Sequence, residues 1–389
     1  MKKIGLLSYH FWYNYGTCLQ AYALQHVLRK MGFQSEYIDF GWKYPIAPES
    51  FVENFWTYTK NNINLFHEFK IKFYKYIRAI INHNLYSTIF RYYIYKTNNT
   101  LFDEFHNQYI IESPIVKNLN NIEKNYDLFI VGSDQVWNPS CCEKKYFTHF
   151  LLDFVKEKKK KISYAPSVGV KNIDTEIKEL FKLYLPQFHS ISCREESGCS
   201  LLHKTTNLEI TRVLDPTLLM SHEEWMFITE NKKTKPFVLC YILGNKTEIV
   251  KKSLQIAKKH SLDLKIISMS QVIIDNYKKY IISNVGPREF LFFLKKSSCI
   301  LTDSYHGTAF AINFNIPFYS LFKKNGDSTT SDNNRILDLL DLFHLSSRFK
   351  ESFNFNDDFF CDFSESNKIL FKERVRSFNF LKRNINQIL

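Results

Sequence analysis

The chain has 389 residues, 45% of them hydrophobic and 23% charged, which is typical of a folded protein with about two domains. Its net charge of +13 predicts an affinity for anions, but no nucleic-acid-binding motif accompanies the charge, so we expect no nucleic-acid partner. No apolar run approaches the ~20 residues of a membrane span, and the eight cysteines form no CxxC pair, which excludes an integral membrane protein and favours a reduced, cytoplasmic one.

The N-terminal segment predicts a strand, a polar loop and a helix. Ile4–Ser8 has the pattern of a buried strand, and the polar residues that follow it argue against a signal peptide. Beyond the loop Tyr9–Tyr15, apolar residues recur at helical spacing from Leu19 to Met31, and Phe33–Phe40 is the next strand. This start resembles a Rossmann fold but lacks GxGxxG, so it does not indicate a dinucleotide.

Residues 45–120 differ from their surroundings and predict a helical insertion in the first domain. Between Phe66 and Arg78, aromatic residues are interleaved with Lys and Arg. A basic, aromatic helix of this kind can lie on an anionic membrane surface, which would place the protein in peripheral contact with the inner membrane. The other interpretation is a helix that packs its aromatic residues onto its own domain.

Polar loops follow five of the predicted strands. They are Asn14–Thr17, Gly132–Asn138, Pro166–Gly169, Arg194–Ser197 and Asp303–Gly307. Because the carboxyl ends of parallel strands lie at one edge of a sheet, we expect these loops to converge there. Two such sheets that face one another would form a cleft for substrates.

Of these loops, the one that contains His306 has the residues best suited to catalysis. It lies between the strand Cys299–Thr302 and a short helix predicted at Thr308–Asn313, with Ile316–Leu321 as the next strand. The N–H groups at a helix start favour anions, and an imidazole beside them can act as an acid or base. Alternatively, His306 only caps the helix.

Strands and helices alternate in two series along the chain. The second series begins with strands at Phe237–Leu243 and Leu264–Met269, and the junction lies near residues 185–235. A last helix rich in Lys and Arg is predicted at Asn367–Leu389. We therefore predict two α/β domains in series.

Taken in order, the loops resemble the motifs of the polysaccharide pyruvyl transferase family over roughly residues 1–345. The motifs that carry this resemblance are Asn14-Tyr15-Gly16-Thr17 with Leu19–Leu24, Val131–Pro139, Tyr164–Ser167, Ser192–Glu195, Leu214–Thr217 and Asp303–Gly307.

The resemblance implies two Rossmann-like domains facing a cleft, as in GT-B glycosyltransferases. Residues 1–187 would form the acceptor side, with the helical insertion at about 45–120, and residues 188–355 the donor side. Residues 356–389 would be a helical segment that packs back on the first domain. The implied reaction moves a pyruvyl group from phosphoenolpyruvate to hydroxyls of a sugar, forming a ketal. The sugar would belong to a bacterial surface polysaccharide precursor, which a lipid could carry, and no cofactor is needed.

His306 matches the proposed catalytic histidine of that family, and Arg194 matches an arginine of the donor site. Phosphoenolpyruvate carries a phosphate and a carboxylate, so its site needs cations and N–H donors. The alternative for Arg194 is an ion pair with Glu195 or Glu196.

One position departs from the family pattern. Better-characterised members carry an arginine two residues before the histidine, where this chain has Ser304. We predict that Arg335 replaces it, with Arg288 as a weaker candidate, although Arg335 could equally be a surface residue. Ser304, Tyr305 and Gly307 are assigned to the donor site.

On the acceptor side, Asp134 is expected to orient or deprotonate a sugar hydroxyl, or else to cap the following turn. Trp137 is expected to stack on a sugar face or to belong to the core. The residues assigned to acceptor binding are Asn14, Gly16, Thr17, Ser133, Gln135 and Trp137.

Two other functions stay open at this point. One is a glycosyltransferase that uses a nucleotide-sugar donor on the same double fold. The other is a carbohydrate-binding protein that has lost its chemistry together with the arginine. No metal site is predicted, because neither the carboxylates nor the His and Cys residues have ligand spacing.

Overall fold

The computed structural model describes residues 2–41, 94, 97–116, 119–141, 144–230, 232–244, 246–268, 270–322, 333–352 and 359–389. Most of the predicted insertion, including the basic aromatic segment 66–78, lies outside the described residues. Of the part that is described, residues 97–109 form a helix.

The N-terminal sheet has four parallel strands in the order β2-β1-β3-β4. Both β3 and β4 are buried along their whole length, as the nearly continuous apolar run at the start of β3 predicts for that strand. The elements of this half are β1 (Lys3–Leu7), α1 (Tyr15–Lys30), β2 (Gln34–Tyr37), β3 (Leu128–Asp134), α4 (Lys144–Phe147) and β4 (Lys161–Pro166). The chain reverses its strand order between β1 and β3, which is where open sheets of this type bind ligands.

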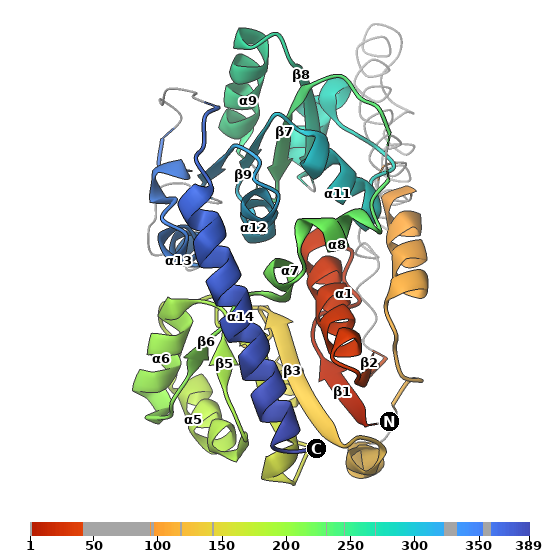
Figure 1. The fold of residues 1–389 in the computed structure, drawn as a ribbon, viewed down its shortest axis with the longest axis vertical. Coiled ribbons are helices and arrows are strands. Elements are labelled where there is room, and N and C mark those ends of the chain that lie inside the picture. The colour runs from red at the N-terminus through yellow and green to blue at the C-terminus, as the bar shows by residue number, and fades with distance from the viewer. Residues whose placement is uncertain are drawn as a thin grey trace, which may run out of the picture.

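The second sheet has five parallel strands in the order β11-β10-β9-β7-β8 and reverses its order between β7 and β9. Figure 1 shows the two sheets in opposite halves of the molecule. This arrangement confirms the predicted α/β class with two Rossmann-like domains. The elements are β7 (Phe237–Ile242), α9 (Thr247–Lys259), β8 (Asp263–Ser268), α10 (Gln271–Asn276), α11 (Pro287–Lys296), β9 (Cys299–Thr302), α12 (Tyr305–Asn313), β10 (Phe318–Leu321), α13 (Asn334–Leu342) and β11 (Phe349–Lys350).

The segment between the two sheets starts beside the first of them. Residues 190–194 lie next to β4, because the N–H of Ser163 donates to the Ser190 carbonyl and the N–H of Arg194 donates to the Pro166 carbonyl. The second sheet therefore begins only at β7. The intervening elements are α5 (Thr175–Tyr184), β5 (Ser192–Cys193), α6 (Glu196–Thr206), β6 (Thr211–Arg212), α7 (Pro216–Leu219) and α8 (His222–Met226).

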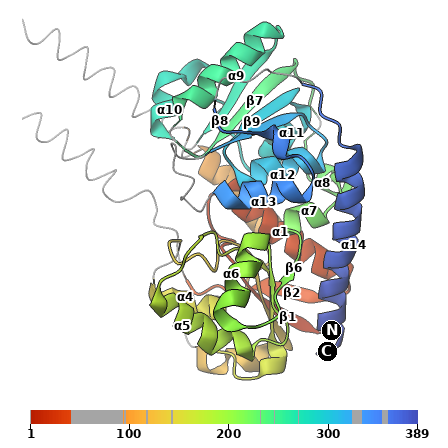
Figure 2. The ribbon, with the colours of Figure 1, turned by 90° about the vertical axis from the view of Figure 1, so that its left-hand side faces the viewer.

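The last helix, α14 (Ser364–Asn386), runs along one side of the molecule past both sheets (Figures 1 and 2). The guanidinium of Arg374 donates to the carbonyls of Leu218 and Met220, and the N–H of Leu214 donates to Oγ of Ser377. Among the described residues, no helix combines the length and apolarity that a membrane span requires.

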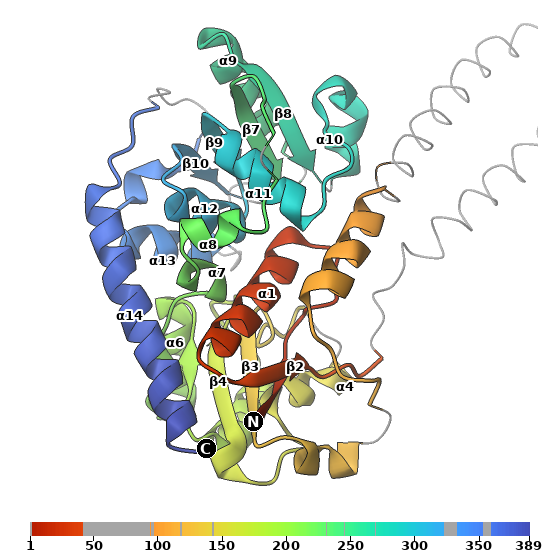
Figure 3. The ribbon, with the colours of Figure 1, turned by 45° about the vertical axis from the view of Figure 1, so that its right-hand side comes forward.

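One hydrophobic core joins the two halves. Leu6 of β1 and Leu239 of β7 belong to the same cluster of buried side chains. Tyr15, in the first turn of α1, stacks on Phe290 of α11, and its hydroxyl donates to the Val285 carbonyl. Figure 3 shows α1 reaching from the first sheet toward α11, with the helix of residues 97–109 beside it. The N-terminus of α1 is therefore fixed at the domain junction.

Candidate active site at the domain junction

The helix that carries His306 begins at Tyr305, three residues earlier than predicted. Ser304 is its N-cap, because Oγ of Ser304 accepts the N–H of Gly307 at 3.3 Å. The carboxylate of Asp303 accepts two N–H groups that follow β7, at 2.7 and 2.8 Å. Ser304, assigned to the donor site from the sequence, thus positions the helix that carries His306.

The imidazole of His306 lies at the junction, next to the first turn of α1. A Cβ atom added to Gly16 would overlap the ring, so glycine is the residue that allows this approach. Asn14 caps α1, since its Oδ1 accepts the N–H of Thr17 at 3.2 Å. The side chain of His306 is only 9% exposed. The N-termini of α1 and α12, which lie in different halves of the molecule, therefore meet at the imidazole of His306.

Asp215 is the centre of the ionic contacts around His306. Its carboxylate is fully buried, and Oδ2 accepts Oγ–H of Ser133 at 2.9 Å. The same oxygen lies 2.7 Å from Nη1 of Arg194 and 3.6 Å from Nε2 of His306. Burial would raise the pKa of Asp215, but the neighbouring His306 and Arg194 outweigh it and hold that pKa below its usual range. The carboxylate is therefore charged.

Arg194 is buried with part of its hydrogen-bonding capacity unused. Its Cζ lies 4.1 Å from the ring centroid of Tyr305, and Nε is 3.7 Å from Oε2 of Glu195. Burial would lower the pKa of Arg194, but the neighbouring Tyr305, Asp215 and Glu195 raise it. Nε and Nη2 are buried and make no hydrogen bond with any residue in the described part of the chain. A charged group with open N–H donors fits an anionic ligand.

A cavity opens beside this guanidinium and takes its walls from both halves of the molecule. Arg335 of α13 contributes its guanidinium, 5.9 Å from the Tyr305 ring centroid. Arg212 of β6 contributes another, paired with Glu373 of α14 at 3.0 Å. The lining residues are Arg194, Glu195, Glu196, Arg212, Leu214, Asp215, Tyr305, Arg335, Asp338, Leu339 and Leu342. Arg288 is not among them, and its Nε donates to the Ile228 carbonyl.

Among the residues assigned to the acceptor from the sequence, Asp134 and Thr17 are brought together where β3 ends and α1 begins. Oγ1 of Thr17 donates to Oδ2 of Asp134 at 2.7 Å, and Asp134 has a φ of 65°. Oε1 of Gln135 accepts Nδ2–H of Asn138 at 2.7 Å. Ser133 points the other way, toward Asp215, so its side chain supports the ionic cluster instead of facing an acceptor.

The assignment of Trp137 to acceptor binding is wrong. Its side chain is 0% exposed, and the indole N–H donates to the Phe150 carbonyl at 2.9 Å. The ring makes edge contacts with Phe181 and Phe188. Since a sugar can stack only on an accessible ring, Trp137 belongs to the core.

Two site residues received no role from the sequence. Asp215 occurs in the motif Leu214-Asp215-Pro216-Thr217, whose Asp-Pro pair is typical of a simple helix start. Glu195 was considered only as a partner of Arg194, but its Oε1 accepts Oγ–H of Ser167 and the N–H of Val168. In both cases the signal was an acidic residue shortly after a strand, Glu195 two positions after β5 and Asp215 three positions after β6.

Comparison with known proteins identifies a family for this chain. A family model for polysaccharide pyruvyl transferases matches residues 14–321. No curated protein matches the chain in sequence.

Among solved structures, the chain is similar to UDP-GlcNAc 2-epimerase of Methanocaldococcus jannaschii in complex with UDP-GlcNAc and UDP, at 12% identity over 96% of this chain and 99% of that chain, with a TM-score of 0.44. It is also similar to S. aureus MnaA with UDP, at 12% identity over 99% of this chain and 98% of that chain, with a TM-score of 0.48. The similarity to the pneumococcal O-GlcNAc transferase GtfA is 13% identity over 68% of this chain and 53% of that chain, with a TM-score of 0.36. These likenesses are distant, whereas the family match covers most of the chain. The chain belongs to the polysaccharide pyruvyl transferase family.

Proposed function

We propose that the protein transfers a pyruvyl group from phosphoenolpyruvate to two hydroxyls of a sugar in a bacterial surface polysaccharide precursor. The observation that carries the proposal is the buried guanidinium of Arg194, whose Nε and Nη2 have no hydrogen-bond partner among the described residues. It lies beside a cavity and shares Asp215 with His306. Family membership supports a transferase that acts on polysaccharides.

The cavity presents three of the guanidinium groups that the donor requires, together with the carboxylates of Glu195, Glu196, Asp215 and Asp338. Phosphoenolpyruvate is a small polyanion, and planar guanidinium groups bind carboxylates and phosphates through paired N–H donors. Arg194, Arg212 and Arg335 all line the cavity. In this proposal Arg335 replaces the arginine that other members carry at the position of Ser304.

His306 would move the proton. It donates a proton to C3 of phosphoenolpyruvate while the first sugar hydroxyl bonds to C2, and it recovers a proton from that hydroxyl. The C2–O bond to phosphate then breaks, and the second hydroxyl bonds to C2 and closes the ketal. The proton of the second hydroxyl leaves with inorganic phosphate. Asp215, 3.6 Å from Nε2 of His306, stabilises the imidazolium.

The acceptor would approach from the side of the first sheet. Asp134, held by Thr17, would orient or deprotonate a sugar hydroxyl. Asn14 and Gly16 keep the start of α1 close to the imidazole, and Gln135 lies on the neighbouring loop. A lipid-linked acceptor at the cytoplasmic face of the inner membrane, with residues 66–78 on the membrane surface, stays a prediction.

Thermal unfolding with phosphoenolpyruvate tests the donor assignment. At a hundredfold excess over its dissociation constant, a ligand specific for the native state adds ~2.7 kcal/mol of stability. We expect this gain in the wild type and its loss in Arg194→Lys, which keeps the charge but not the fork of donors. His306→Ala should still bind phosphoenolpyruvate but release no phosphate when acceptor glycans are supplied.

Arg348→Lys is the matched control. Arg348 is also buried, with its guanidinium 4.3 Å from the ring of Tyr319, but it does not line the cavity. This variant should keep the stabilisation by phosphoenolpyruvate. Stabilisation by UDP-GlcNAc and none by phosphoenolpyruvate would contradict the proposal and favour a glycosyltransferase.

A further inference from the structure

Three side chains of metal-ligating type meet outside the cavity described above. His10 lies in the loop after β1, His106 on the helix of residues 97–109, and Glu112 pairs with Tyr37 beside β2. Their ligand atoms all lie within 4.8 Å of one another. Oε1 of Glu112 is 2.5 Å from Nε2 of His10 and 3.2 Å from Nε2 of His106. Two imidazoles thus converge on one carboxylate oxygen.

The orientation of His10 is fixed by its other ring nitrogen. Nδ1 of His10 lies 2.9 Å from the carbonyl oxygen of Ser8, which can only accept, so Nδ1 carries a proton and donates it. The ring is 3% exposed and stacks on Tyr37 with 4.5 Å between centroids. Metal-bound histidines are held in this way, by a hydrogen bond from the second nitrogen to a carbonyl or carboxylate.

In this cluster the Nε2 atoms of His10 and His106 face Oε1 of Glu112. In neutral imidazoles with the proton on Nδ1, all three atoms are acceptors, and a cation between them would balance this arrangement. In a neutral His10 imidazole with its proton on Nδ1, Nε2 presents a lone pair to the carboxylate of Glu112. Within the described residues, the Nε2 atoms of His10 and His106 are buried and make no hydrogen bond of ordinary geometry. Two protons could supply the positive charge, as two imidazolium rings whose centroids are 6.0 Å apart. One divalent ion would satisfy all three ligand atoms at once.

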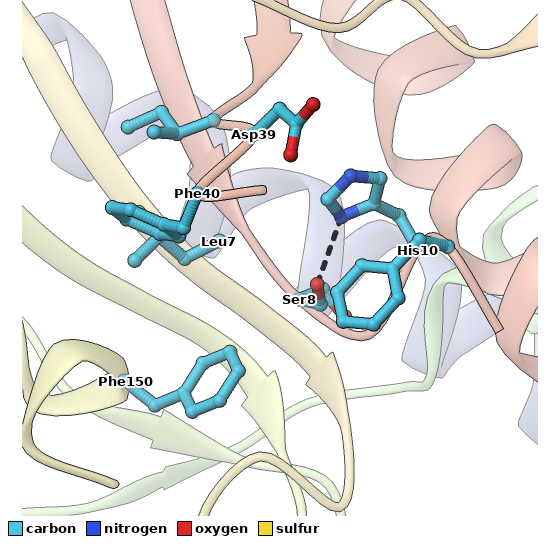
Figure 4. A pocket seen from close by; sticks show the side chains of 8 residues that line it. Leu7, Ser8, His10, Asp39, Phe40 and Phe150 are labelled. Atoms are coloured by element: carbon cyan, nitrogen blue, oxygen red, sulfur yellow. Dashed lines mark hydrogen bonds between the residues drawn. The ribbon is translucent and has the colours of Figure 1, made fainter. Parts of the chain in front are cut away.

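We propose that His10, His106 and Glu112 bind a divalent transition-metal ion of the zinc type. Two imidazoles and one carboxylate form a donor set that zinc accepts, with water in the fourth position. A small cavity lies on the other side of His10, lined also by Ser8, Asp39 and Phe40; His106 and Glu112 do not line it (Figure 4). The sequence predicted no metal site, because His10 lies 96 positions before His106 along the chain.

The ion would tie three separate segments together. It would join the loop after β1 to the helix of residues 97–109 and to the strand-like segment at Glu112. Hydrogen bonds continue from this loop to the candidate active site, because Oγ of Ser8 donates to the Ser133 carbonyl and Oγ of Ser133 donates to Asp215. A bound ion would therefore stabilise the framework that holds Asp215.

Zinc titration of the full chain tests the proposal. After treatment with a chelator, the wild type should bind one Zn²⁺ per chain in calorimetry, and Co²⁺ should give the visible absorption of a tetrahedral site. Glu112→Gln and His106→Ala should each weaken zinc binding by at least ~10–100-fold. Both side chains are partly exposed, so these variants are expected to fold, which circular dichroism without metal checks.

His149→Ala is the matched control. His149 pairs with Asp153 at 3.1 Å, and both side chains have exposures close to those of His106 and Glu112. Within the described residues, His149 and Asp153 have no third potential ligand near enough to complete a metal site. This variant should bind zinc as the wild type does. Absence of stoichiometric binding by the wild type, or equal affinity in Glu112→Gln, would overturn the proposal and leave a His-Glu-His ion pair.

Discussion

Gly16 of α1 and His306 of α12 are in direct contact although their helices come from different halves of the molecule. The backbone of Gly16 lies against the imidazole so closely that a Cβ atom would overlap the ring. We expect Gly16→Ala to displace His306 from Asp215 and to lower pyruvyl transfer about 10²-fold, the cost of a ~1 Å misplacement. Phosphate release measures it. Gly32→Asn, where nothing lies within 4 Å of the new Cβ, should keep full activity, and equal rates in the two variants would refute the contact.

Asp215→Asn removes the charge that neutralises Arg194. Breaking a buried ion pair at one partner leaves the other charge uncompensated, so we expect a loss of ~3–5 kcal/mol in the free energy of unfolding. Ser133→Ala removes only a hydrogen bond to the same oxygen and should cost about 1–2 kcal/mol. Urea unfolding of the two variants checks the difference. Equal losses would mean that the pair with Arg194 contributes little.

We predict that the contact of Glu224 in α8 with Lys30 in α1 is sensitive to acid. Burial would raise the pKa of Glu224, but hydrogen bonds from Lys30 and from the N–H of Ser221 lower it below 4.5. A lowered folded-state pKa gives stability that is present above pH 4.5 and is lost as the pH falls through the folded value. The difference in unfolding free energy between wild type and Glu224→Gln should therefore shrink below pH 4.5.

The control for this titration is Glu179→Gln. Glu179 pairs with Lys182 at 2.8 Å on the exposed face of α5, and exposed pairs contribute at most ~1 kcal/mol. Urea unfolding should show that the unfolding free energies of wild type and Glu179→Gln differ by a small amount that stays the same between neutral and acidic pH. A pH-independent difference for Glu224→Gln would be the contrary result.

Trp137→Phe should lower stability without changing substrate binding. The substitution removes the hydrogen bond to the Phe150 carbonyl and leaves part of the indole volume empty, at a cost of ~1–3 kcal/mol. The KM for the acceptor and the stabilisation by phosphoenolpyruvate should stay at wild-type values. A raised acceptor KM with unchanged stability would restore Trp137 to the acceptor site.

Arg374 is predicted to hold α14 onto the domain junction. Its guanidinium donates to the carbonyls of Leu218 and Met220 and to Oδ1 of Asn313, at 2.6, 3.1 and 2.7 Å. We expect Arg374→Ala to speed hydrogen exchange along α14 and to cost ~2–4 kcal/mol, since buried acceptors lose a charged donor. Arg376→Ala, whose side chain is 52% exposed, should leave exchange unchanged.

Local patterns predicted the strands well and the start of one helix less well. The strand at Cys299–Thr302 has the predicted bounds, because four consecutive apolar or β-branched residues are typical of a strand buried on both faces. The predicted helix at Thr308–Asn313 begins instead at Tyr305, since Ser304 supplies the N-cap. Tyr305-His306-Gly307 has turn-like composition, and only the capping hydrogen bond shows that it is helical.

The sequence by itself determined the α/β class and the order of the motif loops, and it predicted His306 and Arg194 as site residues, because each motif consists of residues that are close together in the chain. The tertiary structure decided their partners. Asp215 reaches Arg194 across 21 positions and Ser133 across 82. Gly16 meets His306, and His10 meets His106 and Glu112, only after the sheets have packed. Such contacts depend on the path of the whole backbone, which no local pattern encodes, and the same packing buries Trp137 in the core.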